Sequence, residues 1–130
     1  MPLGQFDEKT PFLDSERFES TDTPGTYKQV FDVQAPAMLR IDMIQVFNSD
    51  TVSHTVVISG NNSDQLTYAA ATVPAGAGYG TTPPVDLLGL ALPGTQFHYL
   101  IFWDNALWFT VGEAVTAATA VHFVLQGGYV

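Results

Sequence analysis

Three histidines are the residues of this sequence best suited to chemistry, because an imidazole ring can bind a metal ion or transfer a proton near neutral pH. His54, His98 and His122 all lie in segments with the alternating pattern of β-strands. Strands that placed all three imidazoles on one inner wall would create a metal site. Their spacing matches no metal-ligand motif, however, and structural or surface roles fit them better. We therefore predict no metal site and no cofactor.

Loops rich in Asn and Asp, and one Ser–His pair, offer further candidates. Asn48–Asp50 and Asn61–Asp64 carry oxygen ligands that calcium could use, but neither follows the EF-hand spacing, and ordinary turns explain both. Ser53 precedes His54, as a nucleophile beside its base would. Adjacent strand residues point to opposite faces, which separates these two side chains. We therefore predict no catalytic residue and no enzymatic activity.

One aromatic residue is a candidate for ligand binding. Tyr79 lies in the segment Pro74–Gly80, whose glycines permit positive φ angles and predict a loop. Aromatic faces on β-sandwiches can bind sugars, whereas Tyr99, Trp103 and Trp108 have the pattern of core residues. Tyr79 therefore marks the candidate ligand loop.

The distribution of charge limits the partners of the protein. Thirteen acidic and four basic residues give a net charge of −9, and no Lys or Arg follows Arg40. Nucleic acids and anionic membranes are bound through basic residues, so neither is an expected partner. The sequence has no cysteine, no secretory leader at its start and no apolar run of membrane-spanning length, so we expect a soluble protein that is not secreted.

From Pro24 onward, short apolar runs alternate with Gly, Pro and Asn, which is typical of an all-β protein. We predict an antiparallel β-sandwich or jelly roll of about eight strands over residues 25–130. A change of phase at Met43–Ile44 predicts a β-bulge, and Asp104–Ala106 predicts a hairpin between its flanking strands. Gly127 is expected to end the last strand. The expected strands are Tyr27–Val33, Met38–Phe47, His54–Ser59, Leu66–Val73, Val85–Leu92, Phe97–Trp103, Leu107–Val111 and Ala120–Gln126.

Residues 1–24 have no sustained period, and we predict an extended N-terminal arm. Its spaced apolar residues could dock into a neighbouring chain, and the expected interface residues are Phe6, Phe12, Leu13 and Phe18. The alternatives are a frayed terminus or an arm folded onto its own domain. Sheet edges are commonly protected by lysine, and after Arg40 this chain has none, so another subunit is expected to cover them. A homo-oligomer, with a trimer favoured, would satisfy this requirement.

Four segments of the sequence resemble small structural proteins of tailed bacteriophages. They are Val46–Ser49, Thr55–Gly60, Val73–Gly76 and Ala114–Val121 with the ending Gly127–Tyr129. The resemblance covers about residues 40–130. It implies a virion component such as a decoration or cement protein on the capsid surface, present in the host cytoplasm during assembly. The implied partners are the major capsid protein and further copies of the chain.

Two other functions remain open at this stage. One is a receptor- or glycan-binding module of a tail or spike, which would use the loop around Tyr79. The other is a small cupin-like enzyme that would use the histidines.

Overall fold

The computed structural model describes residues 10–32, 38–60, 67–87, 101–103 and 106–129, and the elements in these ranges are β-strands. Within the same ranges no helix is long and apolar enough to cross a membrane. The strands are β1 Thr10–Phe18, β2 Tyr27–Asp32, β3 Met38–Asn48, β4 His54–Ser59, β5 Thr67–Val73, β6 Val85–Asp86, β7 Ile101–Trp103, β8 Ala106–Val111 and β9 Val121–Tyr129.

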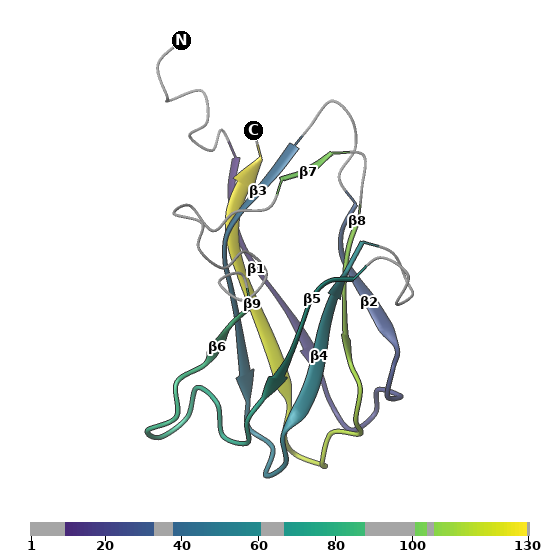
Figure 1. The fold of residues 1–130 in the computed structure, drawn as a ribbon, viewed down its shortest axis with the longest axis vertical. Coiled ribbons are helices and arrows are strands. Elements are labelled where there is room, and N and C mark those ends of the chain that lie inside the picture. The colour runs from purple at the N-terminus through teal and green to yellow at the C-terminus, as the bar shows by residue number, and fades with distance from the viewer. Residues whose placement is uncertain (1–9, 33–37, 61–66, 88–100, 104–105, 130) are drawn as a thin grey trace.

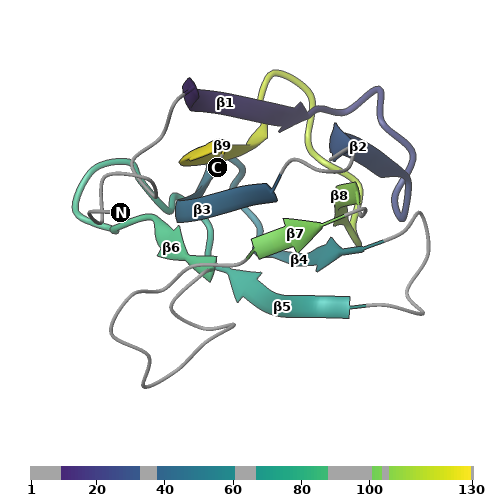
Figure 2. The same cartoon turned by 90° about the horizontal axis from the view of Figure 1, so that it is seen from above.

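The strands form two antiparallel sheets that pack face to face (Figures 1 and 2). Sheet A has the order β1-β9-β3-β6, with β7 also paired to β3, and sheet B has the order β2-β8-β4-β5. The pairing is nested, since β1 pairs with β9, β2 with β8, β3 with both β6 and β7, and β4 with β5. This nested order is that of a jelly roll. The predicted antiparallel β-sandwich is therefore confirmed.

Alternating side chains build the core between the sheets. In β4, Val56 and Ile58 are fully buried while Thr55 is exposed, and in β9 Phe123 and Leu125 are fully buried. The apolar residues of each strand thus face the opposite sheet, because successive side chains of a strand point to opposite faces.

Stacked aromatic rings join the two sheets at the centre of the core. Phe109 of β8 stacks on Phe123 of β9, with ring centroids 4.4 Å apart and 15° between the planes. Phe18 of β1 meets Phe123 edge-on at 5.7 Å. The cluster therefore connects three strands from both sheets in geometries that aromatic pairs favour.

A bulge is present in β3, just before the predicted position at Met43–Ile44. The register between β3 and β9 shifts between Ile41 and Met43, which leaves Asp42 as the extra residue. Beside this shift, a Cβ atom at Gly127 would collide with the backbone carbonyl oxygen of Arg40. Gly127 therefore allows the two backbones to approach, and β9 continues through it to Tyr129 instead of ending there as the sequence suggested.

The predicted hairpin around Asp104–Ala106 is wrong. β7 pairs with β3 in sheet A, whereas β8 pairs with β2 and β4 in sheet B. Residues 101–103 and 106–111 are neighbours in sequence but belong to different layers. The strand partners are set by the nested pairing and not by the local turn signal.

The N-terminal segment contributes a strand to the domain. β1 lies within residues 1–24 and pairs with β9 in nine successive register positions, from Thr10 opposite Tyr129 to Phe18 opposite Val121. Phe18 is 2% exposed and belongs to the core. Residues 10–18 thus follow the alternative in which the arm folds onto its own domain, while residues 1–9 lie outside the described residues.

The burial of Phe18 gives a test of this arrangement. Phe18→Ala should lower the free energy of unfolding by about 3–5 kcal/mol, the usual cost of emptying a buried phenylalanine site. Tyr79→Ala is the matched control, because Tyr79 is 51% exposed and its loss should cost less than about 0.5 kcal/mol. Chemical denaturation measures both. Equal stabilities of wild type and Phe18→Ala would contradict the placement of β1 in the core.

Candidate functional site

Three loops meet at one end of the sandwich, the lower end in Figure 1, and we call this region the loop end. It comprises residues 49–53 between β3 and β4, residues 74–84 between β5 and β6, and residues 112–120 between β8 and β9. Among the described residues, the exposed large apolar side chains are Val52 and Tyr79 in these loops, at 48% and 51%. The loop end is therefore a candidate binding surface.

Asn48 fastens two of these loops together. Its side chain is fully buried, and its Nδ2 donates hydrogen bonds to the carbonyl oxygens of Val52 at 2.9 Å and Pro74 at 3.2 Å. Its Oδ1 accepts a bond from the N–H of Asp50 at 2.9 Å, and its own N–H donates to the carbonyl of Ala77 at 2.8 Å. One side chain at the end of β3 thus fixes the positions of two loops.

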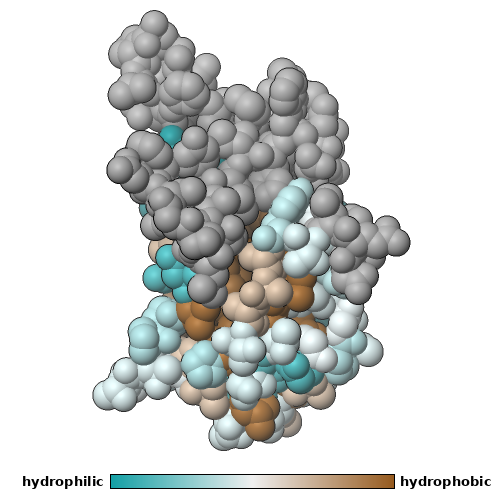
Figure 3. Space-filling view, viewed as in Figure 1, coloured by the Kyte–Doolittle hydropathy of each residue, from teal (hydrophilic) through white to brown (hydrophobic). Residues whose placement is uncertain are grey.

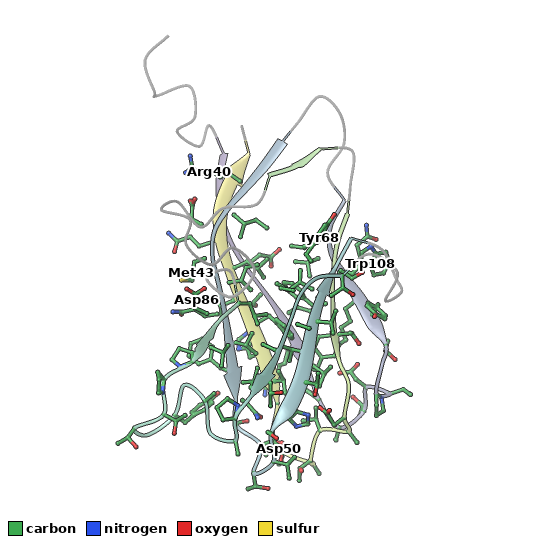
Figure 4. The ribbon with its side chains drawn as sticks, in the orientation of Figure 1. Arg40, Met43, Asp50, Tyr68, Asp86 and Trp108 are labelled. Atoms are coloured by element: carbon green, nitrogen blue, oxygen red, sulfur yellow. The ribbon has the colours of Figure 1, made fainter. Side chains whose placement is uncertain are left out.

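Asp50 extends this network to the third loop (Figure 4). Its Oδ2 accepts the backbone N–H of Thr116 at 2.9 Å and Nε2 of His54 at 2.8 Å, and its Oδ1 accepts the N–H of Thr51 at 2.6 Å. Burial alone would raise the pKa of Asp50. The hydrogen bonds from Thr116, His54 and Thr51 outweigh burial and hold the pKa well below its usual range. The carboxylate is consequently ionised and acts as an acceptor for all three loop-end donors.

His54 lies between two carboxylates. Its ring is fully buried, and its Nε2 must donate to Asp50, because an ionised carboxylate can only accept. Its Nδ1 lies 3.5 Å from Oε1 of Glu113 and has no hydrogen-bond partner. That Oε1 instead accepts the N–H of Thr55 at 2.6 Å, and the Glu113 side chain is 46% exposed.

This arrangement orients an imidazole, and within the described residues no nucleophile bonds to it. A nucleophile would have to bond to the ring, and the ring's Nε2 is bonded to Asp50 while Nδ1 has no partner. Ser53 is exposed and His54 is buried, as expected for neighbours on opposite faces. The described residues contain no group of three metal-ligating side chains. The Asp50–His54 pair joins the loop of residues 49–53 to β4. The sequence had suggested Asp50 as a turn residue and a possible calcium ligand.

The two histidines that the structure describes do not converge. His54 faces the core from sheet B, whereas His122 alternates with the core residues Val121 and Phe123 of β9 and so lies on the outer face of sheet A. His98 lies outside the described residues. The described histidines therefore do not share one inner wall.

The loop that carries Tyr79 is tightly organised. Gly76, Gly78 and Gly80 all have positive φ angles, as the sequence suggested. The N–H of Gly78 donates to the carbonyl of Thr82 at 2.8 Å. A Cβ atom at Gly78 would collide with the ring of Phe47, and that ring meets Tyr79 edge-on at a centroid distance of 6.5 Å. Tyr79 is consequently exposed but supported from beneath.

The predicted interface residues of the arm have separate positions. Phe12 and Leu13 lie in β1, opposite Gly127 and Gln126 of β9, and Phe18 lies in the core with Nζ of Lys28 4.5 Å from its ring centroid. Phe6 lies outside the described residues. Tyr79 belongs to the loop end and is not grouped with the arm residues.

Fold and loop end together define the class of this protein as an antiparallel β-sandwich with a hydrogen-bonded loop end. No protein-family model matches the chain, and a search of curated proteins finds no match. The function must therefore be argued from the molecule itself.

The Asp50 network makes a prediction about acid stability. An ionised Asp50 with a lowered pKa stabilises the fold at pH values above its ordinary pKa of 3.8, and this contribution is lost as the pH falls through the lowered value. Asp50→Asn should lower the free energy of unfolding by about 1–3 kcal/mol at pH 7, because the amide cannot accept all three bonds. It should also make the stability fall less steeply below pH 4.

Glu19→Gln provides the control for this experiment, because Glu19 forms an exposed ion pair with Arg17, and such pairs contribute little to stability. Denaturant melts between pH 2 and pH 7 measure the effect. An Asp50→Asn variant with wild-type stability over this whole range would contradict the role of the network.

Proposed function

We propose that this chain is a non-enzymatic structural protein of a virus particle, a subunit that decorates and stabilises a capsid through contacts with the capsid protein and with copies of itself. One observation carries the proposal. β8, β4 and β5 are adjacent in sheet B, and together they contain no Asp, Glu, Lys or Arg. A soluble chain with a net charge of −9 has acids to place on its surface, yet it keeps them off three neighbouring strands.

A group of three adjacent uncharged strands favours binding to other proteins. Charged residues are depleted at the centres of protein interfaces, and aromatic residues are enriched there. Tyr68 of β5 and Trp108 of β8 lie on the side of sheet B, whereas Arg40 and Asp86 lie on the side of sheet A (Figure 4). The charge asymmetry between the two sheets supports one face for assembly and one face for solvent.

The basic residues support a protein partner as well. Arg17 pairs with Glu19 at 2.6 Å, Lys28 with Asp22 at 3.1 Å and Arg40 with Asp42 at 2.9 Å. The basic residues of the described ranges are Arg17, Lys28 and Arg40. Each of them already has an acidic neighbour. Their charges are thus matched within the chain instead of being presented to a phosphate backbone.

Residues 1–9 are proposed to contact the capsid, because the next segment, Thr10–Phe18, is part of sheet A. Removing residues 1–9 should leave the unfolding midpoint unchanged and reduce binding to capsids that lack the protein by at least tenfold. Co-sedimentation of purified protein with such capsids measures the binding, and Tyr79→Ala in the full chain is the control that should bind normally. Failure of the full chain to sediment with capsids would contradict the proposed function.

A glycan- or receptor-binding module of a tail or spike is the second candidate, and the exposure of Tyr79 above Phe47 favours it. Under this alternative, the isolated protein should bind a sugar on a glycan array. Tyr79→Ala should weaken that binding about fivefold, because aromatic contacts contribute about 1 kcal/mol. Val52→Ala, in the neighbouring loop, should have little effect. An array with no saturable binding would exclude this candidate.

A further inference from the structure

One ring nitrogen of His54 is a buried polar atom that the loop end leaves without a bond. The His54 side chain is fully buried, and within the described residues its Nδ1 has no hydrogen-bond partner. Because buried polar atoms in folded proteins nearly always have a partner, such an exception calls for a physical explanation. The carboxylate oxygen Oε1 of Glu113 lies 3.5 Å from this nitrogen. The unsatisfied atom is therefore close to an acceptor.

The number of protons on the ring decides whether these two atoms attract or repel each other. The ionised Asp50 can only accept, so the proton of a neutral ring is on Nε2, 2.8 Å from Oδ2 of Asp50. Nδ1 then holds a lone pair, which cannot bond to a carboxylate oxygen because both atoms are acceptors. A second proton turns Nδ1 into a donor and makes the ring a cation between two carboxyl groups.

We propose that His54 binds a second proton at Nδ1 as the pH falls below neutral, and that this proton closes a hydrogen bond to Oε1 of Glu113. The distance between the two atoms would then shorten from 3.5 Å to about 2.8 Å, the usual length of a bond between a charged nitrogen and a carboxylate. The Glu113 side chain is 46% exposed, so it has room for this small movement. We call the resulting bridge from Asp50 through His54 to Glu113 the histidine latch.

The histidine latch joins two loops of the loop end. Asp50 belongs to the loop of residues 49–53, and its Oδ2 also accepts the N–H of Thr116 at 2.9 Å. Glu113 belongs to the loop of residues 112–120, and its Oε1 accepts the N–H of Thr55 at 2.6 Å. Within the described residues, that bond from Thr55 is the one that holds the Glu113 carboxylate while the ring is neutral. Protonation of His54 therefore adds a second tie at the start of the loop of residues 112–120.

The charges around the ring favour a cation. Among the described residues, the charged groups in contact with His54 are Asp50 and Glu113, one at each ring nitrogen. Its neighbour across the sheet in β5 is Val73, and β8 and the loop of residues 74–84 contain no charged residue. The described bases pair with acids elsewhere. Burial opposes the charged ring, whereas two carboxylates attract it and no described base repels it.

Nuclear magnetic resonance of the full chain with ¹⁵N-labelled histidine tests the latch, because two-bond ¹H–¹⁵N correlations show which ring nitrogens carry protons. The titration runs from pH 8 to pH 5, the range in which histidine side chains change charge. The His54 ring should change from a proton on Nε2 alone to protons on both nitrogens. His122, on the outer face of sheet A, is the reference within the same sample. A His54 ring whose Nδ1 stays unprotonated down to pH 5 would overturn the proposal.

Glu113→Gln tests the partner of the new bond. This change keeps the size of the side chain and an oxygen that can accept from Thr55, but it removes the negative charge beside Nδ1. It should lower the midpoint of the His54 titration by at least half a pH unit, which is about a threefold loss of proton affinity. Glu19→Gln is the matched control, because Glu19 forms its ion pair with Arg17. Equal midpoints in wild type and Glu113→Gln would contradict the latch.

Amide hydrogen exchange measures the effect on the loops. After correction for the intrinsic rate, the amide of Thr55 should exchange at least threefold more slowly at pH 5.5 than at pH 7.5 in the wild type. This difference should disappear in Glu113→Gln. Equal protection of the wild-type amide at the two pH values would show that the proton does not fasten the loop, and would overturn the proposal. All three measurements use the chain alone, so their outcomes are independent of capsid or glycan binding.

Discussion

The stacking of Phe109 on Phe123 is the interaction on which the rest of the structure depends. It joins sheet B to sheet A at van der Waals distance, and Phe18 packs against the same ring from β1. Because β1 and β9 lie near opposite ends of the chain, this contact closes the nested pairing that defines the fold. A few hydrogen bonds can then hold the loops of the loop end in place, because the strands that bear these loops already lie side by side.

Much of this fold was predictable from the sequence. The alternation in His54–Ser59 gave β4 with its observed bounds, and the predicted strand Tyr27–Val33 contains β2. These segments have both an alternating pattern and Gly, Pro or Asn residues that mark their ends, so local chemistry specifies them. The bulge in β3 was visible for the same reason, because an extra residue shifts the phase of the apolar pattern.

Features that depend on distant parts of the chain were not predictable in this way. Alternation identifies β7 and β8 as strands but not their partners, so the nearest turn suggested a hairpin that the two sheets exclude. Gly127 suggested the end of a strand, whereas it is needed where β9 passes close to Arg40. The bond between Asp50 and His54 forms across a turn, while the alternation rule applies only within a strand. In the sequence, Phe18 was predicted to dock into a neighbouring chain. Its partner within the chain, Phe123, lies more than a hundred positions away, so no local pattern indicates the contact.

Charge placement is the feature of this fold that supports the proposed role in assembly. Figure 3 shows the side chains of one face of the molecule by hydropathy. The described bases are paired with acids, the buried Asp50 is used to organise loops, and three adjacent strands of sheet B have no charge at all. Electron cryomicroscopy of virus particles that contain this chain tests the central claim most directly. The predicted result is density for the sandwich on the capsid surface, with sheet B against another subunit and sheet A toward solvent. Particles in which sheet B faces solvent and makes no protein contact would contradict it.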